Sequence, residues 1–338
     1  WSILAITFTN KAANEMKERV EKLVGDIAQD MWLGTFHSIC VRILRRYIDR
    51  IGFENSFVIF DTTDQKSMIK ACLKELQIDD KLFNDRAVLS EISNAKNEML
   101  EPEQYIARHV GDYRKETIGK VYTLYQKRLK ENNAIDFDDI INFAIKILLE
   151  NPDVLDYYSG KFHYVLVDEY QDTNKAQFTL ITILASRYGN ITVVGDNDQG
   201  IYSFRGADIS NILNFEKDFP GTKIIKLEQN YRCTGNILKA ANAVIKHNEN
   251  KYEKKLWTEN DEGTLPIIHR ADDEYDEAME ARNDSYVAAA RHYFSFMPLD
   301  GDPNADYVYA DFEEYFCFAY AILWCVENGH EPVGQGLF

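Results

Sequence analysis

The chain has 338 residues and a mass of 39.2 kDa, more than one hydrophobic core usually serves, so we expect two domains or one domain with a large insertion. Hydrophobic residues make up 45% and charged residues 28%, and no apolar run approaches the roughly 18 residues of a membrane span, which excludes a membrane-spanning protein. The five cysteines lack the spacing of a zinc site or a disulfide framework, so we expect a reducing, cytoplasmic location. The sequence starts with Trp1 inside an apolar run that lacks signal-peptide features, and we expect it to be cut from a longer protein.

The net charge of −17 is distributed unevenly. Of the 55 acidic and 38 basic residues, 17 acidic and only 3 basic ones lie between Asp261 and Phe338. The rest of the chain is nearly neutral, and local basic clusters such as Arg42, Arg45 and Arg46 can present a positive surface to a phosphate backbone. The composition therefore leaves a nucleic-acid partner open.

Short apolar runs alternate with helical periodicity in much of the chain. An apolar run at Ile3–Ile6 precedes an amphipathic segment at Lys11–Val24, which predicts a strand followed by a helix. Three further apolar runs that end in polar residues predict strands at Tyr164–Val167, Ile191–Val194 and Ile224–Leu227. Strands that are apolar on both faces and separated by helices predict an α/β fold with a parallel sheet covered on both sides.

The strand pattern is interrupted between Asp61 and about Asn133. Three amphipathic stripes in this stretch predict a purely helical insertion in the α/β domain. They comprise Met68, Ile69, Cys72, Leu73 and Leu76; Val88, Leu89 and Ile92; and Ile118, Val121, Tyr122, Tyr125 and Leu129.

Two adjacent carboxylates directly follow the predicted strand at Tyr164–Val167. Ligands of open parallel sheets bind outside the carboxyl ends of the strands, which is where Asp168 and Glu169 lie. One carboxylate of such a pair can ligate Mg²⁺ on a nucleotide's phosphates, and the other can orient or deprotonate the attacking water. A solvated acidic turn is the alternative for the Asp-Glu pair alone, although the longer string Val167–Asn174 is far rarer by chance.

The next predicted strand leads into a polar and aromatic segment. Gln199 can hydrogen-bond a terminal phosphate, whereas Tyr202, Phe204 and Arg205 can stack on bases and contact a nucleic-acid backbone. Aromatic side chains that pack in the core are the alternative. After the last predicted strand, Arg232 could reach a transferring phosphoryl group, a weak signal by itself.

Six segments occur together in an order and approximate spacing that are too dense for chance. They are Leu4–Ala13, Gly34–Ser38, Asp136–Asp139, Val167–Asn174, Val193–Ala207 and Gln229–Cys233. They resemble the UvrD/PcrA/Rep-like superfamily-one DNA helicases, and the resemblance covers about residues 1–270. It implies two RecA-like domains of the P-loop NTPase type, each with a helical insertion.

The resemblance also implies a domain organisation. Residues 1–60 and 134–222 would form the first RecA-like domain, 61–133 its helical insertion and 223–275 the start of the second RecA-like domain. Residues 276–338, an acidic and aromatic-rich tail, match nothing in these helicases and receive no fold assignment.

Roles at the nucleotide follow from the same resemblance, which implies ATP and Mg²⁺ as cofactors. Asp168 resembles the Mg²⁺ ligand, Glu169 the catalytic base and Gln199 the sensor of the γ-phosphate. Arg232 is similar to the arginine that reaches the γ-phosphate across the domain cleft, and Tyr231 to the aromatic residue that stacks on adenine.

Further residues resemble the positions at which the family contacts DNA. They are Phe8, Thr35, His37, Ser38, Tyr202, Phe204 and Arg205. The family often has Trp where Phe204 stands, and the smaller ring should still stack on a base. A buried neutral histidine with a structural role is the alternative for His37.

The sequence departs from the family in two respects. No Gly-x-x-x-x-Gly-Lys-Ser/Thr string occurs in it, and the family carries this phosphate loop upstream of the position that matches Trp1. The later motifs of the second RecA-like domain are also absent. We therefore expect residues 1–338 alone to hydrolyse ATP poorly or not at all.

The implied function is that of a fragment of an ATP-dependent 3′→5′ DNA helicase that moves on single-stranded DNA and unwinds duplexes in repair or replication. The implied partners are single-stranded DNA and single/double-strand junctions, without a membrane. Two alternatives stay open: a catalytically inactive single-strand-binding remnant, and the helicase part of a helicase-nuclease, although no nuclease carboxylate cluster is evident in the sequence.

Overall fold

The computed structural model describes residues 2–25, 28, 31–248 and 254–266. The chain divides into two compact units, Trp1–Thr222 and Lys223–Phe338. The acidic tail at 276–338 lies outside the described residues. Among the helices that are described, none is long and apolar enough to cross a membrane.

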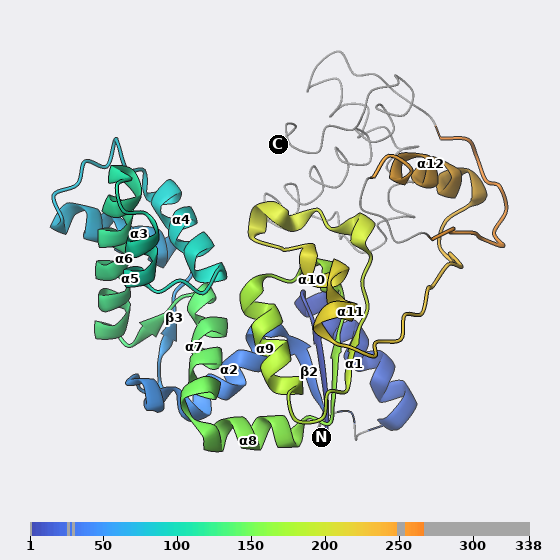
Figure 1. Ribbon diagram of the computed structural model, residues 1–338, viewed down its shortest axis with the longest axis horizontal. Helices are drawn as coiled ribbons and strands as arrows, with labels where there is room; N and C mark the ends of the chain where they lie inside the picture. Colours follow the sequence, from blue (N-terminus) through green and yellow to red (C-terminus); the bar gives the residue numbers. More distant parts are fainter. Residues whose placement is uncertain (1, 26–27, 29–30, 249–253, 267–338) are drawn as a thin grey trace, which may run out of the picture. The chain divides into compact units, whose positions relative to one another are not determined.

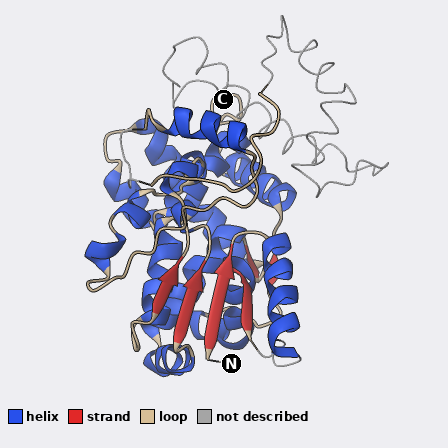
Figure 2. Ribbon diagram, turned by 90° about the vertical axis from the view of Figure 1, so that its right-hand side faces the viewer, coloured by secondary structure: helices blue, strands red, loops and turns tan. Residues whose placement is uncertain are grey.

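A four-stranded parallel sheet forms the centre of the first unit, as Figure 2 shows by arrows that run in one direction. Its order is β2 (Trp32–Thr35), β1 (Ile3–Thr7), β5 (Tyr164–Val167) and β6 (Ile191–Val193). The register places Ile6 opposite both Gly34 and Val167, and Val167 opposite Val193. The carboxyl ends of all four strands therefore meet at one edge.

Helices cover the sheet (Figure 1), and all but the first of them contribute to the main hydrophobic core or pack against it. They are α1 (Asn10–Val24), α2 (Phe36–Tyr47), α7 (Phe137–Glu150), α8 (Pro152–Lys161), α9 (Lys175–Ala185) and the short α10 (Ser210–Leu213) and α11 (Phe215–Asp218). The α/β prediction is confirmed. On β5, however, Val165 and Val167 are buried while Tyr164 and Leu166 point the other way and are exposed, so among the described residues only one face of this strand is covered.

The helical insertion begins and ends at a second, two-stranded parallel sheet of β3 (Val58–Ile59) and β4 (Ala134–Ile135). Between these strands lie α3 (Thr62–Glu75), α4 (Asp85–Asn97), α5 (Pro102–Arg108) and α6 (Tyr113–Glu131). Figure 1 shows the four helices grouped on one side of α7. Most residues of the predicted stripes are buried in a separate core, to which Phe83, Ala95, Tyr105 and Ala134 also contribute, whereas Leu76 is exposed. The all-helical insertion is confirmed.

A buried charge network joins this insertion to the start of α7. Lys96, near the end of α4, lies 2.6 Å from Asp136 Oδ2 and 2.7 Å from Asp139 Oδ1, and its side chain is only 1% exposed. Burial alone would lower the pKa of Lys96, but the two carboxylates raise it above its usual range. Tyr125 of α6 donates a further hydrogen bond to Asp136 over 2.9 Å.

The predicted strand at Ile224–Leu227 is wrong. In the described part of the second unit this segment has no ladder partner, and only an isolated bridge joins Gln229 to Trp257. A strand is stabilised by its neighbours in a sheet, and here Ile225 and Leu227 are 70% and 77% exposed. The unit also contains α12 (Gly235–Ile245).

Candidate functional site

Asp168 and Glu169 follow β5 directly, at the carboxyl edge of the sheet. The Asp168 N–H donates to Ile6 O over 2.9 Å, which continues the pairing with β1. Glu169 has left-handed backbone angles, φ 49° and ψ 44°, and its N–H donates to Asp168 Oδ1 over 3.0 Å. A residue other than glycine is strained in this conformation, and such strain often occurs at functional sites.

Gln199 lies on the same edge, after the adjacent strand β6. It ends the short 3₁₀ helix η4 (Asn197–Gln199), whose N-cap is Asp196. The Gln199 Nε2 group donates to Asp196 Oδ2 over 3.0 Å. Because β5 and β6 are parallel neighbours, the structure brings Gln199 to the edge that carries Asp168 and Glu169.

A residue without a predicted role, Gln171, connects these two segments. Its Nε2 donates to Glu169 Oε2 over 2.8 Å, and its Oε1 accepts from the Asp196 N–H over 3.0 Å. A continuous series of hydrogen bonds therefore runs from Glu169 through Gln171 and Asp196 to Gln199. The only sequence signal for Gln171 was that it lies in the rare string Val167–Asn174. That string does not reveal which groups its side-chain amide binds.

Asp172 completes the acidic group at this edge. Burial raises its pKa to about 6, and the negative charge of Glu169 contributes to the rise. Within the described part of the chain its Oδ1 is buried without a hydrogen-bond partner. The side chain is therefore suited to hold a proton in mildly acidic solution.

The predicted DNA-contacting segment forms the 3₁₀ helix η5 (Tyr202–Arg205). The side chains of Phe204 and Arg205 lie outside the described residues, and Tyr202 is partly buried. Farther along the loop, the Asp208 N–H donates to Thr173 O over 3.0 Å, and Asn211 Nδ2 donates to the same oxygen over 2.9 Å. The loop is thus anchored on the segment that follows Glu169.

Three of the other predicted DNA-contacting residues have visible local roles. Phe8 follows β1 and packs edge-on against Phe36, with 5.3 Å between the ring centroids. Thr35 is the N-cap of α2: its Oγ1 accepts from the Ser38 N–H over 3.2 Å, and Ser38 Oγ donates back to Thr35 O over 2.9 Å. The Thr35 side chain is buried, while Ser38 is exposed on the helix.

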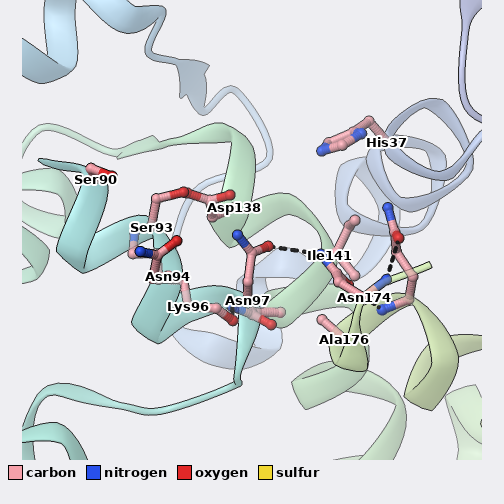
Figure 3. Close-up of a pocket in the computed structure, with 12 residues that line it drawn as sticks. His37, Ser90, Ser93, Asn94, Lys96, Asn97, Asp138, Ile141, Asn174 and Ala176 are labelled. Carbon is pink, nitrogen blue, oxygen red and sulfur yellow. Dashed lines mark hydrogen bonds between the residues drawn. The ribbon is translucent and has the colours of Figure 1, made fainter. Parts of the chain in front are cut away.

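His37 lines a pocket of about 370 Å³ between the insertion and the sheet domain. Burial lowers the pKa of His37, and a hydrogen bond with the backbone of Phe137 opposes this effect. Figure 3 shows its ring above a lining rich in amide and hydroxyl groups, in which Asn174 Nδ2 donates to Asn97 Oδ1 over 2.8 Å. The neutral ring that burial favours suits either a structural or a binding role, so the role in DNA binding stays a prediction.

Tyr231 and Arg232 belong to the second unit. Tyr231 is 79% exposed, and its hydroxyl donates to Gln229 Oε1 over 2.7 Å. The Arg232 N–H donates to Asn230 Oδ1 over 2.9 Å. Their predicted positions at the nucleotide stay predictions.

Residues 1–220 match the model of the UvrD/REP helicase N-terminal domain. The chain belongs to the UvrD/REP helicase family. Residues 225–284 match the UvrD-like helicase C-terminal domain.

Curated relatives extend this result. The chain is 56% identical over 277 residues to the ATP-dependent DNA helicase PcrA of Bacillus subtilis (strain 168), which covers 82% of this chain and 37% of the relative. The PcrA proteins of Staphylococcus aureus (strain Mu50) and Staphylococcus epidermidis (strain ATCC 35984) are each 55% identical over 278 residues, covering 82% of this chain and 38% of each relative. The chain therefore spans little more than a third of the length of these relatives.

Proposed function

We propose that this chain is a fragment of an ATP-dependent 3′→5′ DNA helicase that couples ATP hydrolysis to movement on single-stranded DNA. One observation carries the proposal: Asp168, Glu169 and Gln199 share the carboxyl edge of the sheet and are joined through Gln171 and Asp196. Family membership and the names of the relatives support it. Both the family and the linked side chains favour a motor over an inactive single-strand-binding remnant. A remnant of that kind would not need carboxylates and amides joined at the edge of the sheet.

The residues at this edge fit a magnesium nucleotide. Asp168 offers carboxylate oxygen to Mg²⁺, which is usually held by one or two carboxylates, phosphates and water. Among the described residues, no group of three or more His, Cys, Asp or Glu side chains could hold a metal ion. Bound Mg²⁺ would supply positive charge that stabilises the transferring phosphoryl group.

Glu169 would act as the base. Its Oε2 is held by Gln171, and among the described residues nothing donates a hydrogen bond to Oε1. Oε1 can therefore accept a proton from a water molecule while the carboxylate keeps its orientation. Gln199 can then donate to the terminal phosphate, and Arg232 would stabilise the same charge, as the family resemblance implies.

We further propose single-stranded DNA and its junctions with duplex as the partners, repair or replication as the setting and the cytoplasm as the location. The domain boundaries implied by the resemblance belong to the same proposal, including a first RecA-like domain at residues 1–60 and 134–222. The seven DNA-contacting residues would form the strand path, with aromatic rings stacking on bases.

A chimaera tests the catalytic part. The 277 matching residues would replace their counterpart in Bacillus subtilis PcrA, which shares 56% identity with them. We expect DNA-stimulated ATP hydrolysis, and we expect Glu169→Gln to abolish turnover while nucleotide binding is retained, because the base acts mainly in the transition state. A folded, active chimaera whose turnover survives Glu169→Gln would contradict the assignment.

Residues 1–338 alone provide the complementary measurement. Their sequence contains no phosphate-loop string, so we expect ATP hydrolysis at the background level. Robust hydrolysis that disappears in Glu169→Gln would show that the missing loop is dispensable.

A further inference from the structure

Two clamps hold the loop that carries Tyr202 onto the segment after β5. The near clamp is Gln171, whose Oε1 accepts from the Asp196 N–H over 3.0 Å. The far clamp is Asn211, whose Nδ2 donates to Thr173 O over 2.9 Å and to Thr173 Oγ1 over 3.1 Å. Of these two clamp side chains, only Gln171 also contacts Glu169.

The side chain of Gln171, the near clamp, is buried and closely surrounded by other atoms. Gln171 is only 2% exposed, so these two hydrogen bonds and a longer third one, from Nε2 to Asp172 Oδ2 over 3.5 Å, are shielded from water. Gly195 passes so near that a Cβ there would lie 2.7 Å from Gln171 Oε1 and 3.2 Å from the Tyr170 nitrogen. A buried amide with both ends engaged cannot shift one partner without disturbing the other.

The geometry points to Gln171 as a positioning residue that couples the loop to the catalytic base. We propose that strand binding to the loop at Tyr202–Arg205 changes the position of the Asp196 N–H, and that the rigid amide passes this change to the Glu169 carboxylate. The inference rests on the proposed function, since it assumes that the loop binds single-stranded DNA and that Glu169 is the base.

The link can be measured in residues 1–338 without ATP turnover. The side-chain carboxyl carbons of glutamate are ¹³C-labelled, and the Glu169 resonance is assigned from its loss in Glu169→Gln. A fluorescent single-stranded oligothymidylate serves as the probe, with affinity followed by anisotropy. In the wild-type chain we expect the Glu169 resonance to move with the same midpoint as binding.

Three variants separate the link from simple structural support. Gln171→Met removes all three hydrogen bonds of the amide at similar volume, and Gln171→Glu keeps an acceptor for the Asp196 N–H but has no N–H donor. We expect both to bind the oligonucleotide within about threefold of the wild type while the Glu169 displacement falls at least fourfold. Asn211→Leu, the matched control, removes the far clamp and should leave most of the Glu169 displacement.

The outcomes distinguish the inference from the proposed function. A wild-type chain that fails to bind the oligonucleotide would contradict the proposed function and the inference together. Binding without movement of the Glu169 resonance would overturn the inference alone. So would full displacement in a folded Gln171→Met or Gln171→Glu protein, or loss of displacement in Asn211→Leu to the same extent.

Discussion

Lys96 on α4 and Asp136 at the start of α7 form an ion pair with 2.6 Å between Nζ and Oδ2, and both side chains are almost fully buried. The carboxylate also accepts from Tyr125 of α6, so three elements meet at one oxygen. Lys96 belongs to the insertion and Asp136 to the segment that returns to the sheet domain. The pair therefore helps to hold the insertion in a defined position against α7.

Replacing Lys96 with methionine should lower the free energy of unfolding by about 3–5 kcal/mol, because it leaves Asp136 and Asp139 buried without their cation. Urea unfolding followed by circular dichroism measures the change. Lys70→Met is the control: Lys70 is exposed and pairs with Asp85 at 3.5 Å, and its loss should cost less than about 1 kcal/mol. Equal effects of the two substitutions would contradict a special role for the buried pair.

Asp172 should give stability a pH dependence in mildly acidic solution. Its folded-state pKa is raised to about 6 from an ordinary value near 3.8, so the folded protein holds this proton more tightly than the unfolded chain. The contribution of this proton to the free energy of unfolding is fully present below about pH 4 and is lost as the pH rises to about 6. Asp172→Asn should flatten this part of the curve of unfolding free energy against pH, and an unchanged curve would rule out Asp172 as its source.

Single-stranded DNA should bind residues 1–338 more tightly than duplex, and binding should weaken with salt. Phe204→Ala should weaken binding by about 1–3 kcal/mol, the usual worth of one stacked base. Anisotropy titrations at two salt concentrations provide the measurement. If Phe204→Ala, Tyr202→Ala and Phe8→Ala all leave affinity unchanged, these rings serve packing instead.

Asn174 should contribute both a helix cap and a link to the insertion. Its Oδ1 accepts from the Gln177 N–H over 2.9 Å at the start of α9, and its Nδ2 donates to Asn97 over 2.8 Å. Asn174→Ala should cost about 1–2 kcal/mol of unfolding free energy. A double-mutant cycle with Asn97→Ala should give a coupling of about 0.5–1.5 kcal/mol, and zero coupling would mean that the link contributes nothing.

The fold was predictable from sequence where a pattern has one physical cause. Alternation of apolar strands with helices identified the parallel sheet, and amphipathic stripes identified the insertion, because both patterns reflect burial. The strand prediction for Ile224–Leu227 failed because an apolar run becomes a strand only when it pairs with another strand. The sequence pattern holds no information on which strand that would be.

The candidate site was predictable only in part for a related reason. Asp168, Glu169 and Gln199 stand out because polar residues at the ends of parallel strands gather at one edge. Gln171 and Lys96 do not stand out, because Asp196, which binds Gln171, and the two carboxylates that bind Lys96 are distant from them in sequence. An isolated lysine in a helix usually lies on the surface, and only the folded chain shows that Lys96 is buried against two carboxylates.

The pairing of β3 with β4 has a consequence for how much the insertion can vary. Val58 lies opposite Ala134, so the two ends of the helical insertion are neighbours. For the sheet domain, the insertion is therefore a loop whose ends are held together. The entropy of closing such a loop depends only logarithmically on its length. Segments could thus be gained or lost between Ile59 and Ala134 at little entropic cost to the sheet, provided that the anchors at Lys96 and Asn97 are kept.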